Sequence, residues 1–219
     1  MTEKMRRARK AMKEALLSII KDENRIITGR IDPQYLSDNL GRKKGTAEAV
    51  VFPVSTGEVS GIMRYAWENN LPVTPRGAGT NLVGSTVPSG HGIVLDVSLM
   101  NHVLELDEET FTATVEPGAV LEDFQAYVES KGLFYPPDPG EKKAIGGNIS
   151  TNAGGMRAVK YGVTRDYVMG LELVLADGTV VKAGSKNRKD TSGLDLKEIV
   201  IGSEGTLAVI TKCILKLIP

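Results

Sequence analysis

The sequence is poor in cysteine, histidine, aromatic residues and long apolar runs. Its 219 residues include one Cys, two His, one Trp and four Phe, which excludes an intrachain disulfide and leaves too few histidines for a histidine-rich metal cluster. A single cysteine is typical of a reducing compartment, and no apolar stretch reaches the roughly 20 residues of a membrane-spanning helix. Lys plus Arg and Asp plus Glu each total 27, so there is no basic field for nucleic acid. These absences predict a cytoplasmic protein.

Residues 1–22 are expected to form an N-terminal amphipathic helix. Apolar side chains recur at three- and four-residue spacing from Met5 to Ile20, as on one face of a helix. The other face carries six basic residues between Lys4 and Lys13. A basic amphipathic helix can bind peripherally to a membrane surface, and that alternative stays open. We favour a helix that packs on the domain with its charged face in water.

Residues 23–97 have the pattern of a small parallel sheet. Apolar strands are expected at 49–53, 71–75 and 93–97, with a helix between the first two. Thr56 is expected to cap that helix, and its buried face comprises Val59, Ile62, Met63, Ala66 and Trp67. A glycine-rich segment follows the strand at 71–75. It therefore lies at the carboxyl end of that strand, where open α/β sheets bind ligands.

Residues 98–219 are richer in antiparallel patterns. The expected elements are a hairpin of 103–107 with 112–116, a helix that buries Val120, Leu121, Phe124 and Val128, a loop-rich stretch over 134–155, a hairpin of 171–175 with 179–182 around Asp177 and Gly178, and a last strand at 207–217. The predicted fold is therefore α+β with two lobes. A small parallel-sheet lobe covers about 23–97, and a mainly antiparallel lobe with flanking helices covers about 98–219.

The segment Pro75–Gly84 is the strongest candidate for ligand binding. Its glycines let the backbone approach a ligand, and successive amide N–H groups in such a turn form a concave anion site. A P-loop requires Lys before Ser or Thr after its last glycine, whereas Ser85 follows Gly84 directly. A Rossmann fingerprint requires glycine where Leu82 stands. Neither motif fits, and a plain turn without a ligand remains an alternative for this segment alone.

Two further segments have the same character. Residues 144–155 combine four glycines with Asn148, Ser150, Thr151 and Asn152, which supply donors and acceptors suited to a pyrophosphate or a heteroaromatic ring. Residues 201–207 form a third glycine-rich segment that runs into a strand. Three such segments in one chain predict one large polar ligand held mainly by backbone.

Five motifs in this order resemble a known family. They are Pro75–Thr80, Pro136–Pro139, Ile145–Gly155, Lys160–Val163 and Gly202–Leu207. Together they are similar to the FAD-binding domain of the vanillyl-alcohol-oxidase-type (PCMH-type) flavoproteins, closest to the glycolate oxidase FAD subunit and D-lactate dehydrogenase group. The resemblance covers about residues 35–219 and implies two lobes that clamp an extended FAD.

The resemblance also implies a set of cofactor contacts. Arg76 to Asn81 would hold the pyrophosphate through backbone N–H groups, and Gly146 to Ser150 would continue that cradle. The full implied set is Pro75, Arg76, Gly77, Ala78, Gly79, Thr80, Asn81, Pro137, Asp138, Gly146, Gly147, Asn148, Ser150, Asn152, Gly154, Gly155, Gly162, Glu204, Gly205 and Ile210. Members with covalent flavin often carry histidine in the first glycine segment, where this chain has Thr80, so the expected FAD is non-covalent.

The resemblance implies a flavin-dependent 2-hydroxy-acid dehydrogenase or oxidase in which hydride passes from the substrate α-carbon to flavin N5. Relatives are about twice as long and carry a substrate-binding cap domain, which is expected to be missing here. The chain would then be a truncated form or a subunit completed by a partner, and alone should bind FAD at most moderately and turn over poorly. The alternative is a non-catalytic FAD-binding subunit or domain relic that acts through a partner. No catalytic residue or metal ligand is assigned, and the sequence identifies neither the 2-hydroxy acid nor the electron acceptor.

Overall fold

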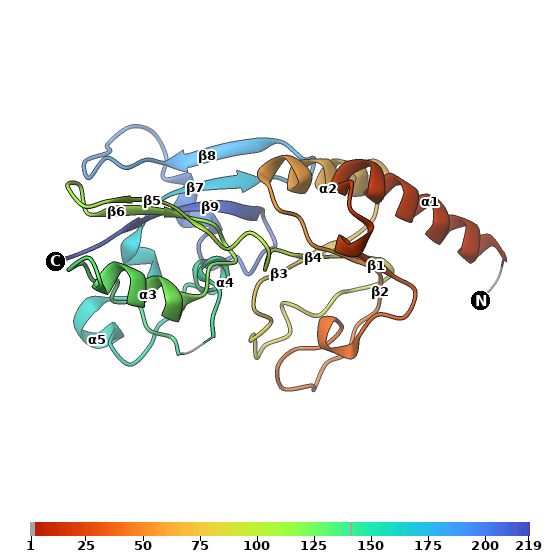
Figure 1. Ribbon diagram of the computed structural model, residues 1–219, viewed down its shortest axis with the longest axis horizontal. Coiled ribbons are helices and arrows are strands. Elements are labelled where there is room, and N and C mark those ends of the chain that lie inside the picture. The colour runs from red at the N-terminus through yellow and green to blue at the C-terminus, as the bar shows by residue number, and fades with distance from the viewer. Residues whose placement is uncertain (1–2, 141) are drawn as a thin grey trace.

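The structure is a computed structural model that describes residues 3–140 and 142–219 (Figure 1). In chain order, its helices (α), 3₁₀ turns (η) and strands (β) are α1 (Glu3–Ile20), η1 (Glu23–Arg25), β1 (Ile26–Thr28), η2 (Pro33–Tyr35), β2 (Ala47–Val51), α2 (Thr56–Glu68), β3 (Val73–Arg76), β4 (Gly92–Asp96), β5 (Val103–Asp107), β6 (Thr112–Val115), α3 (Leu121–Glu129), α4 (Ile145–Thr151), α5 (Ala158–Tyr161), η3 (Thr164–Tyr167), β7 (Val168–Val174), β8 (Val180–Gly184), α6 (Leu196–Val200) and β9 (Val209–Lys216).

The first half of the chain builds a four-stranded sheet in the order β1-β2-β4-β3. β2, β4 and β3 are parallel, and β1 pairs antiparallel with β2 at the edge. Every residue of β4 is buried, which is typical of a central parallel strand covered on both faces. The predicted parallel sheet is confirmed.

The second half builds a five-stranded antiparallel sheet in the order β5-β6-β9-β7-β8. Both predicted hairpins are present, as β5 with β6 and β7 with β8, and the last strand, β9, lies between β6 and β7. Phe124 of α3 and Ile149 of α4 join the strands in one core. Figure 1 shows α3, α4 and α5 gathered on one side of this sheet.

Helix α1 packs on α2, as favoured from its pattern. Met12, Leu16 and Ile20 enter the same core as the buried face of α2, and Arg9 forms an ion pair with Glu48 of β2. Residues 1 and 2 of the predicted helix, and the side chains of Lys4 and Met5, lie outside what the structure describes. Among the helices that it does describe, none has the length and apolar character needed to cross a bilayer.

Three local predictions are wrong. The cap of α2 is Ser55, whose Oγ accepts the Glu58 N–H at 3.2 Å, whereas Thr56 is the first helical residue. Trp67 is 61% exposed because it lies at the edge of the buried stripe, one residue before α2 ends. Val120 is 37% exposed because it precedes α3 as its N-cap.

The predicted loop over 134–155 contains a helix, α4. Its glycines disfavour a helix on propensity alone, but Ile145 and Ile149 are fully buried against the second sheet. Gly146 allows this close packing, because a Cβ there would lie 2.6 Å from Pro117 Cβ. Tertiary packing therefore overrides local propensity at this segment.

Helix α2 also connects the two sheets. Thr56 Oγ1 donates a hydrogen bond to Glu172 Oε1 of β7 at 2.6 Å, and Ser60 Oγ donates to the Gly178 carbonyl at 2.6 Å. Val174 of β7 and Val209 of β9 are members of the core that α2 forms with the first sheet. Apolar burial and polar contacts thus hold the two sheets in a fixed relation.

Replacing Thr56 by Val tests the polar part of this connection. The variant loses a hydrogen bond to a buried carboxylate, so the free energy of unfolding should fall by about 1 to 2 kcal/mol. Urea denaturation measures the change, with the exposed Thr46→Val as the matched control. Equal stability of the two variants would show that the contact does not stabilise the fold.

The same contact predicts a pH dependence. Burial raises the pKa of Glu172, but hydrogen bonds from Thr56 and Lys212 outweigh it and leave the pKa below the ordinary 4.5. A depressed carboxyl pKa stabilises the fold fully above the unfolded value, and this contribution is lost as pH falls through the folded value. The stability difference between the wild type and Glu172→Gln should therefore be largest near neutral pH and shrink below about pH 4.5. Urea titrations across pH measure it, and the exposed Glu108→Gln should show no such gap.

Candidate functional site

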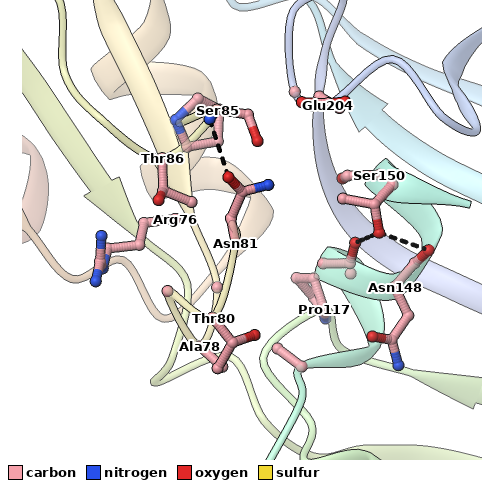
Figure 2. Close-up of a pocket in the computed structure, with 18 of the residues that line it drawn as sticks. Arg76, Ala78, Thr80, Asn81, Ser85, Thr86, Pro117, Asn148, Ser150 and Glu204 are labelled. Carbon is pink, nitrogen blue, oxygen red and sulfur yellow. Dashed lines mark hydrogen bonds between the residues drawn. The ribbon is translucent and has the colours of Figure 1, made fainter. Parts of the chain in front are cut away.

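A cleft of about 410 Å³ lies between the glycine-rich segment after β3 and helix α4 (Figure 2). The three glycine-rich segments predicted from the sequence meet there. The lining residues are Pro75, Arg76, Gly77, Ala78, Gly79, Thr80, Asn81, Leu82, Val83, Ser85, Thr86, Val97, Pro117, Pro139, Lys143, Ala144, Gly146, Gly147, Asn148, Ser150, Thr151, Ala153, Glu204, Gly205, Ala208, Val209 and Ile210.

The first wall offers unbonded backbone donors. Within residues 3–140 and 142–219, no acceptor is bonded to any amide N–H from Gly77 to Leu82. The next three amide groups, of Val83, Gly84 and Ser85, all donate to Asn81 Oδ1 at 2.8–3.1 Å. The side-chain amide oxygen of Asn81 therefore fixes the shape of the segment, while the preceding backbone amide groups remain available to an anion.

The second wall is α4, and it approaches the first wall closely. A Cβ on Gly77 would lie 3.1 Å from Ala144 Cβ, so a side chain at 77 would crowd the passage between the walls. The Gly146 amide donates to the Pro117 carbonyl at 2.8 Å. At Gly147, by contrast, a Cβ would meet nothing within 4 Å, so this residue borders open space in the cleft.

The third segment joins the two walls. The amide groups of Gly202 and Glu204 donate to the carbonyl groups of Ile149 and Ser150 at 3.1 and 2.7 Å, which ties the segment to α4. A Cβ on Gly205 would lie 3.4 Å from Pro75 Cγ, so the segment also borders the first wall. The cleft thus has backbone on three sides.

Among the described residues that line the cleft, Arg76, Lys143 and Glu204 are the ones with ionisable side chains. Arg76 is 9% exposed, and burial lowers the pKa of its guanidinium against the opposing effect of Asp96. Asp96, on the neighbouring strand, is buried too, and burial raises the pKa of its carboxyl. The unbonded amide groups of the first wall and the ammonium group of Lys143 suit an anionic ligand.

Most residues implied by the family resemblance line this cleft: Pro75, Arg76, Gly77, Ala78, Gly79, Thr80, Asn81, Gly146, Gly147, Asn148, Ser150, Glu204, Gly205 and Ile210. Pro137, Asp138, Asn152, Gly154, Gly155 and Gly162 are not among the lining residues.

Several of these six have structural contacts instead. Asn152 ends α4 with a φ of 47°, and its Oδ1 accepts the Arg165 N–H at 3.0 Å. Gly155 lies against the backbone of Asp138, since a Cβ there would be 1.8 Å from the Asp138 carbonyl oxygen. Gly162 has a φ of 88°. A role for these residues in cofactor binding stays a prediction.

Sequence reasoning missed other lining residues, notably Ser85, Thr86, Pro117, Pro139 and Lys143. Thr86 lines the cleft, and its Oγ1 is buried without a hydrogen-bond partner among the described residues. The signal for Ser85 and Thr86 was their position directly after Gly84. Pro117 and Lys143 reach the cleft through tertiary packing, which no local pattern predicts.

Neither histidine lies in the cleft lining. His91 Nδ1 pairs with Glu48 Oε1 at 2.9 Å, and His102 Nδ1 with Glu116 Oε2 at 2.8 Å. Both side chains are mostly exposed. In the described part of the chain, no three His, Cys, Asp or Glu side chains converge as a metal site would require.

A parallel and an antiparallel sheet with a cleft between them that is lined by free backbone amide groups fit a dinucleotide-binding domain. The family model described as the FAD binding domain matches residues 47–184, more than half of the chain. The chain therefore belongs to the FAD-binding domain family, and the predicted cofactor, FAD, agrees with this assignment.

Individual relatives agree. The chain is 47% identical over 212 residues to glycolate oxidase subunit GlcD of Bacillus subtilis, covering 96% of this chain and 45% of the relative. It is 46% identical over 198 residues to D-lactate dehydrogenase of Anaerostipes hadrus, covering 89% and 42%. The solved structure of 6-hydroxy-D-nicotine oxidase from Arthrobacter nicotinovorans superposes with a TM-score of 0.74 at 26% identity, covering 88% and 41%. The chain thus spans less than half the length of these proteins.

Substitution of Gly147 by Leu tests the cleft without straining the fold. The new side chain would enter open space, and glycine within a helix is about 1 kcal/mol less stable than alanine. We expect the variant to be at least as stable as the wild type while FAD affinity falls by about tenfold or more, because the side chain fills the ligand volume. Calorimetric FAD titration and urea denaturation measure the two effects.

The matched control for this variant is Gly57→Leu, in the first turn of α2. A Cβ there meets only Ser55 Oγ, at 3.8 Å, and Gly57 does not line the cleft. This control should leave FAD affinity unchanged. Unchanged affinity in Gly147→Leu as well would exclude the cleft as the FAD site.

Proposed function

We propose that the chain is the FAD-binding part of a flavin-dependent 2-hydroxy-acid dehydrogenase or oxidase of the glycolate or D-lactate type. The observation that carries this proposal is the meeting of three glycine-rich segments in one cleft with unbonded amide groups. Support for the substrate class comes from the names of the two relatives at 47% and 46% identity.

The residues of the cleft fit a dinucleotide. The amide groups from Gly77 to Leu82 would hold the pyrophosphate. Gly147 leaves room for a bulky group beside α4. When bound, the flavin ring supplies the acceptor for a hydride from the substrate α-carbon. Among the described residues that line the cleft none is histidine, which supports non-covalent binding.

We further propose that a cap domain or a partner subunit completes the substrate side. Oxidation of a 2-hydroxy acid requires a base for the hydroxyl proton and cationic groups for the carboxylate. Glu48 and Glu116 hold the two histidines at other places in the described structure, and the relatives are more than twice as long as the matched region. We therefore expect the cap domain or the partner subunit to supply the base.

For location, the proposal is the cytoplasm. The only cysteine, Cys213, is fully buried in the second core, and burial raises the pKa of its thiol, which suits a reduced and unreactive residue. The ion pair of Arg9 with Glu48 directs part of the basic face of α1 toward the protein and not toward a membrane.

Titration of the purified protein with FAD tests the proposal. We expect one FAD per chain by calorimetry, with weaker binding of FMN, which lacks the pyrophosphate and adenosine. Adding glycolate or D-lactate under anaerobic conditions should bleach the bound flavin only slowly. A folded protein that binds no FAD would refute the cofactor assignment. Rapid bleaching by this chain alone would refute the need for a cap domain. No bleaching after addition of the proposed cap domain or partner subunit would favour a non-catalytic subunit.

A further inference from the structure

Arg76 places a guanidinium directly beneath the first glycine-rich segment. It is the last residue of β3, and a Cβ on Gly79 would lie 2.1 Å from Arg76 Nη2 and 2.5 Å from its Cζ. The guanidinium therefore packs against the backbone of Gly79, which lines the cleft on its other side. Figure 2 shows the Arg76 side chain turned away from the opposite wall, behind the segment. One layer of backbone separates its charge from the cleft.

This guanidinium has few partners for a buried cation. The Arg76 residue is 9% exposed, yet the hydrogen bond of its guanidinium is a long one, from Nη1 to the Ser37 carbonyl at 3.5 Å. It also lies 5.7 Å from the centre of the Tyr35 ring. Among residues 3–140 and 142–219, no carboxylate lies within ion-pair distance of Arg76. Asp96, its partner on β4, accepts the Ser98 N–H instead.

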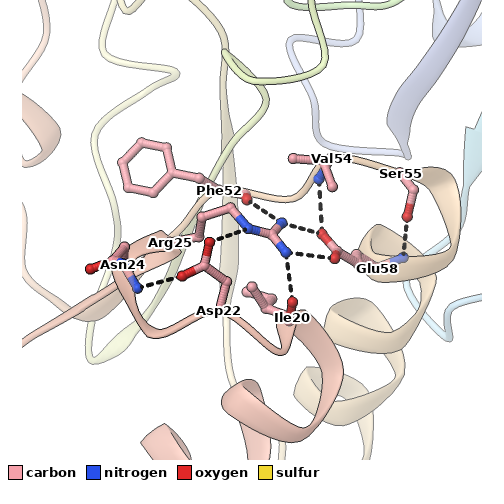
Figure 3. A network of polar contacts seen from close by, with 8 residues as sticks. All are labelled: Ile20, Asp22, Asn24, Arg25, Phe52, Val54, Ser55 and Glu58. Carbon is pink, nitrogen blue, oxygen red and sulfur yellow. Dashed lines mark hydrogen bonds and ion pairs between the residues drawn. The ribbon is translucent and has the colours of Figure 1, made fainter.

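Arg25, in the same half of the chain, shows what a structural arginine looks like here (Figure 3). Its Nη1 and Nη2 donate to the two carboxylate oxygens of Glu58 at 2.6 and 2.9 Å. They also donate to the carbonyl groups of Phe52 and Ile20. The hydrogen bond with Glu58 raises the pKa of Arg25 against the effect of burial, whereas burial lowers the pKa of Arg76.

We infer that the side chain of Arg76, and not only its backbone, recognises the cofactor by supplying a buried countercharge to its pyrophosphate through the glycine-rich segment. A buried charge without a close partner destabilises a fold, so its presence is explained when a ligand brings the opposite charge. Gly79, with a φ of 68°, is the residue that lets the guanidinium lie this close. The inference rests on the proposed dinucleotide function and adds to it a positioning role for the Arg76 charge.

Arg76→Met and Arg76→Lys test the inference with FAD and ADP as probes. Met keeps an unbranched side chain but removes the charge, so the apoprotein should unfold at the same or a higher urea concentration, while affinity for both probes falls by about tenfold or more. Lys keeps the charge and should retain most of the affinity. A structural residue would not move stability and affinity in opposite directions.

Arg25→Met is the matched control, because it breaks a paired arginine in the same half of the chain. It should lower the urea midpoint and leave the FAD and ADP affinities of the folded protein unchanged. If Arg76→Met instead loses stability as Arg25→Met does, or keeps its affinity for ADP, the inference is overturned. The wild-type titrations distinguish failure of the inference from failure of the proposed function. Binding of ADP without FAD would refute only the flavin assignment. Binding of neither probe would refute the proposed function and, with it, the role of the Arg76 charge.

Discussion

The placement of α2 between the two sheets determines the geometry of the cleft. One wall follows the end of β3 in the first sheet, and the other is α4, which packs on the second sheet. The walls themselves meet at small contacts, Gly77 near Ala144 and Gly205 near Pro75. Their spacing therefore depends on the apolar face of α2 and on its bonds to β7 and to the turn after it.

The cleft is lined largely by main chain, and this constrains the sequence around it. Among substitutions only proline removes a main-chain donor, whereas other side chains act by crowding, so glycine is required wherever a Cβ would collide. Each glycine has its own reason: Gly77 faces the opposite wall, Gly79 makes room for Arg76, and Gly146 lets α4 approach Pro117. The positive charge of Arg76 lies behind this main-chain layer, next to Gly79. Arg25 is fully paired within the protein and stabilises the fold, whereas Arg76 lacks a close partner and, in our inference, is paired by the ligand.

Much of the fold could be predicted because its strands follow simple rules. The apolar run of β4 and the Asp177-Gly178 turn predict a buried parallel strand and a hairpin, and both are present. Helix α4 was missed because its glycines lower local propensity, while the packing of Ile145 that stabilises it is long-range. The residues of the site also divide into those that a local pattern predicts and those that only long-range packing brings together. The glycine-rich segments could be recognised one by one, but the contribution of Lys143 depends on how the chain folds back.

The last strand of the chain, β9, is the central strand of the second sheet, and its Val209 also belongs to the core beneath α2. A chain emerging from the ribosome therefore has β6 and β7 without their shared neighbour, and a first core without one of its members. Both halves become complete only when residues 209–216 are released. Until then the apolar surface that β9 covers stays exposed, and exposed apolar surface with unpaired strand edges is what makes partly folded chains prone to aggregate.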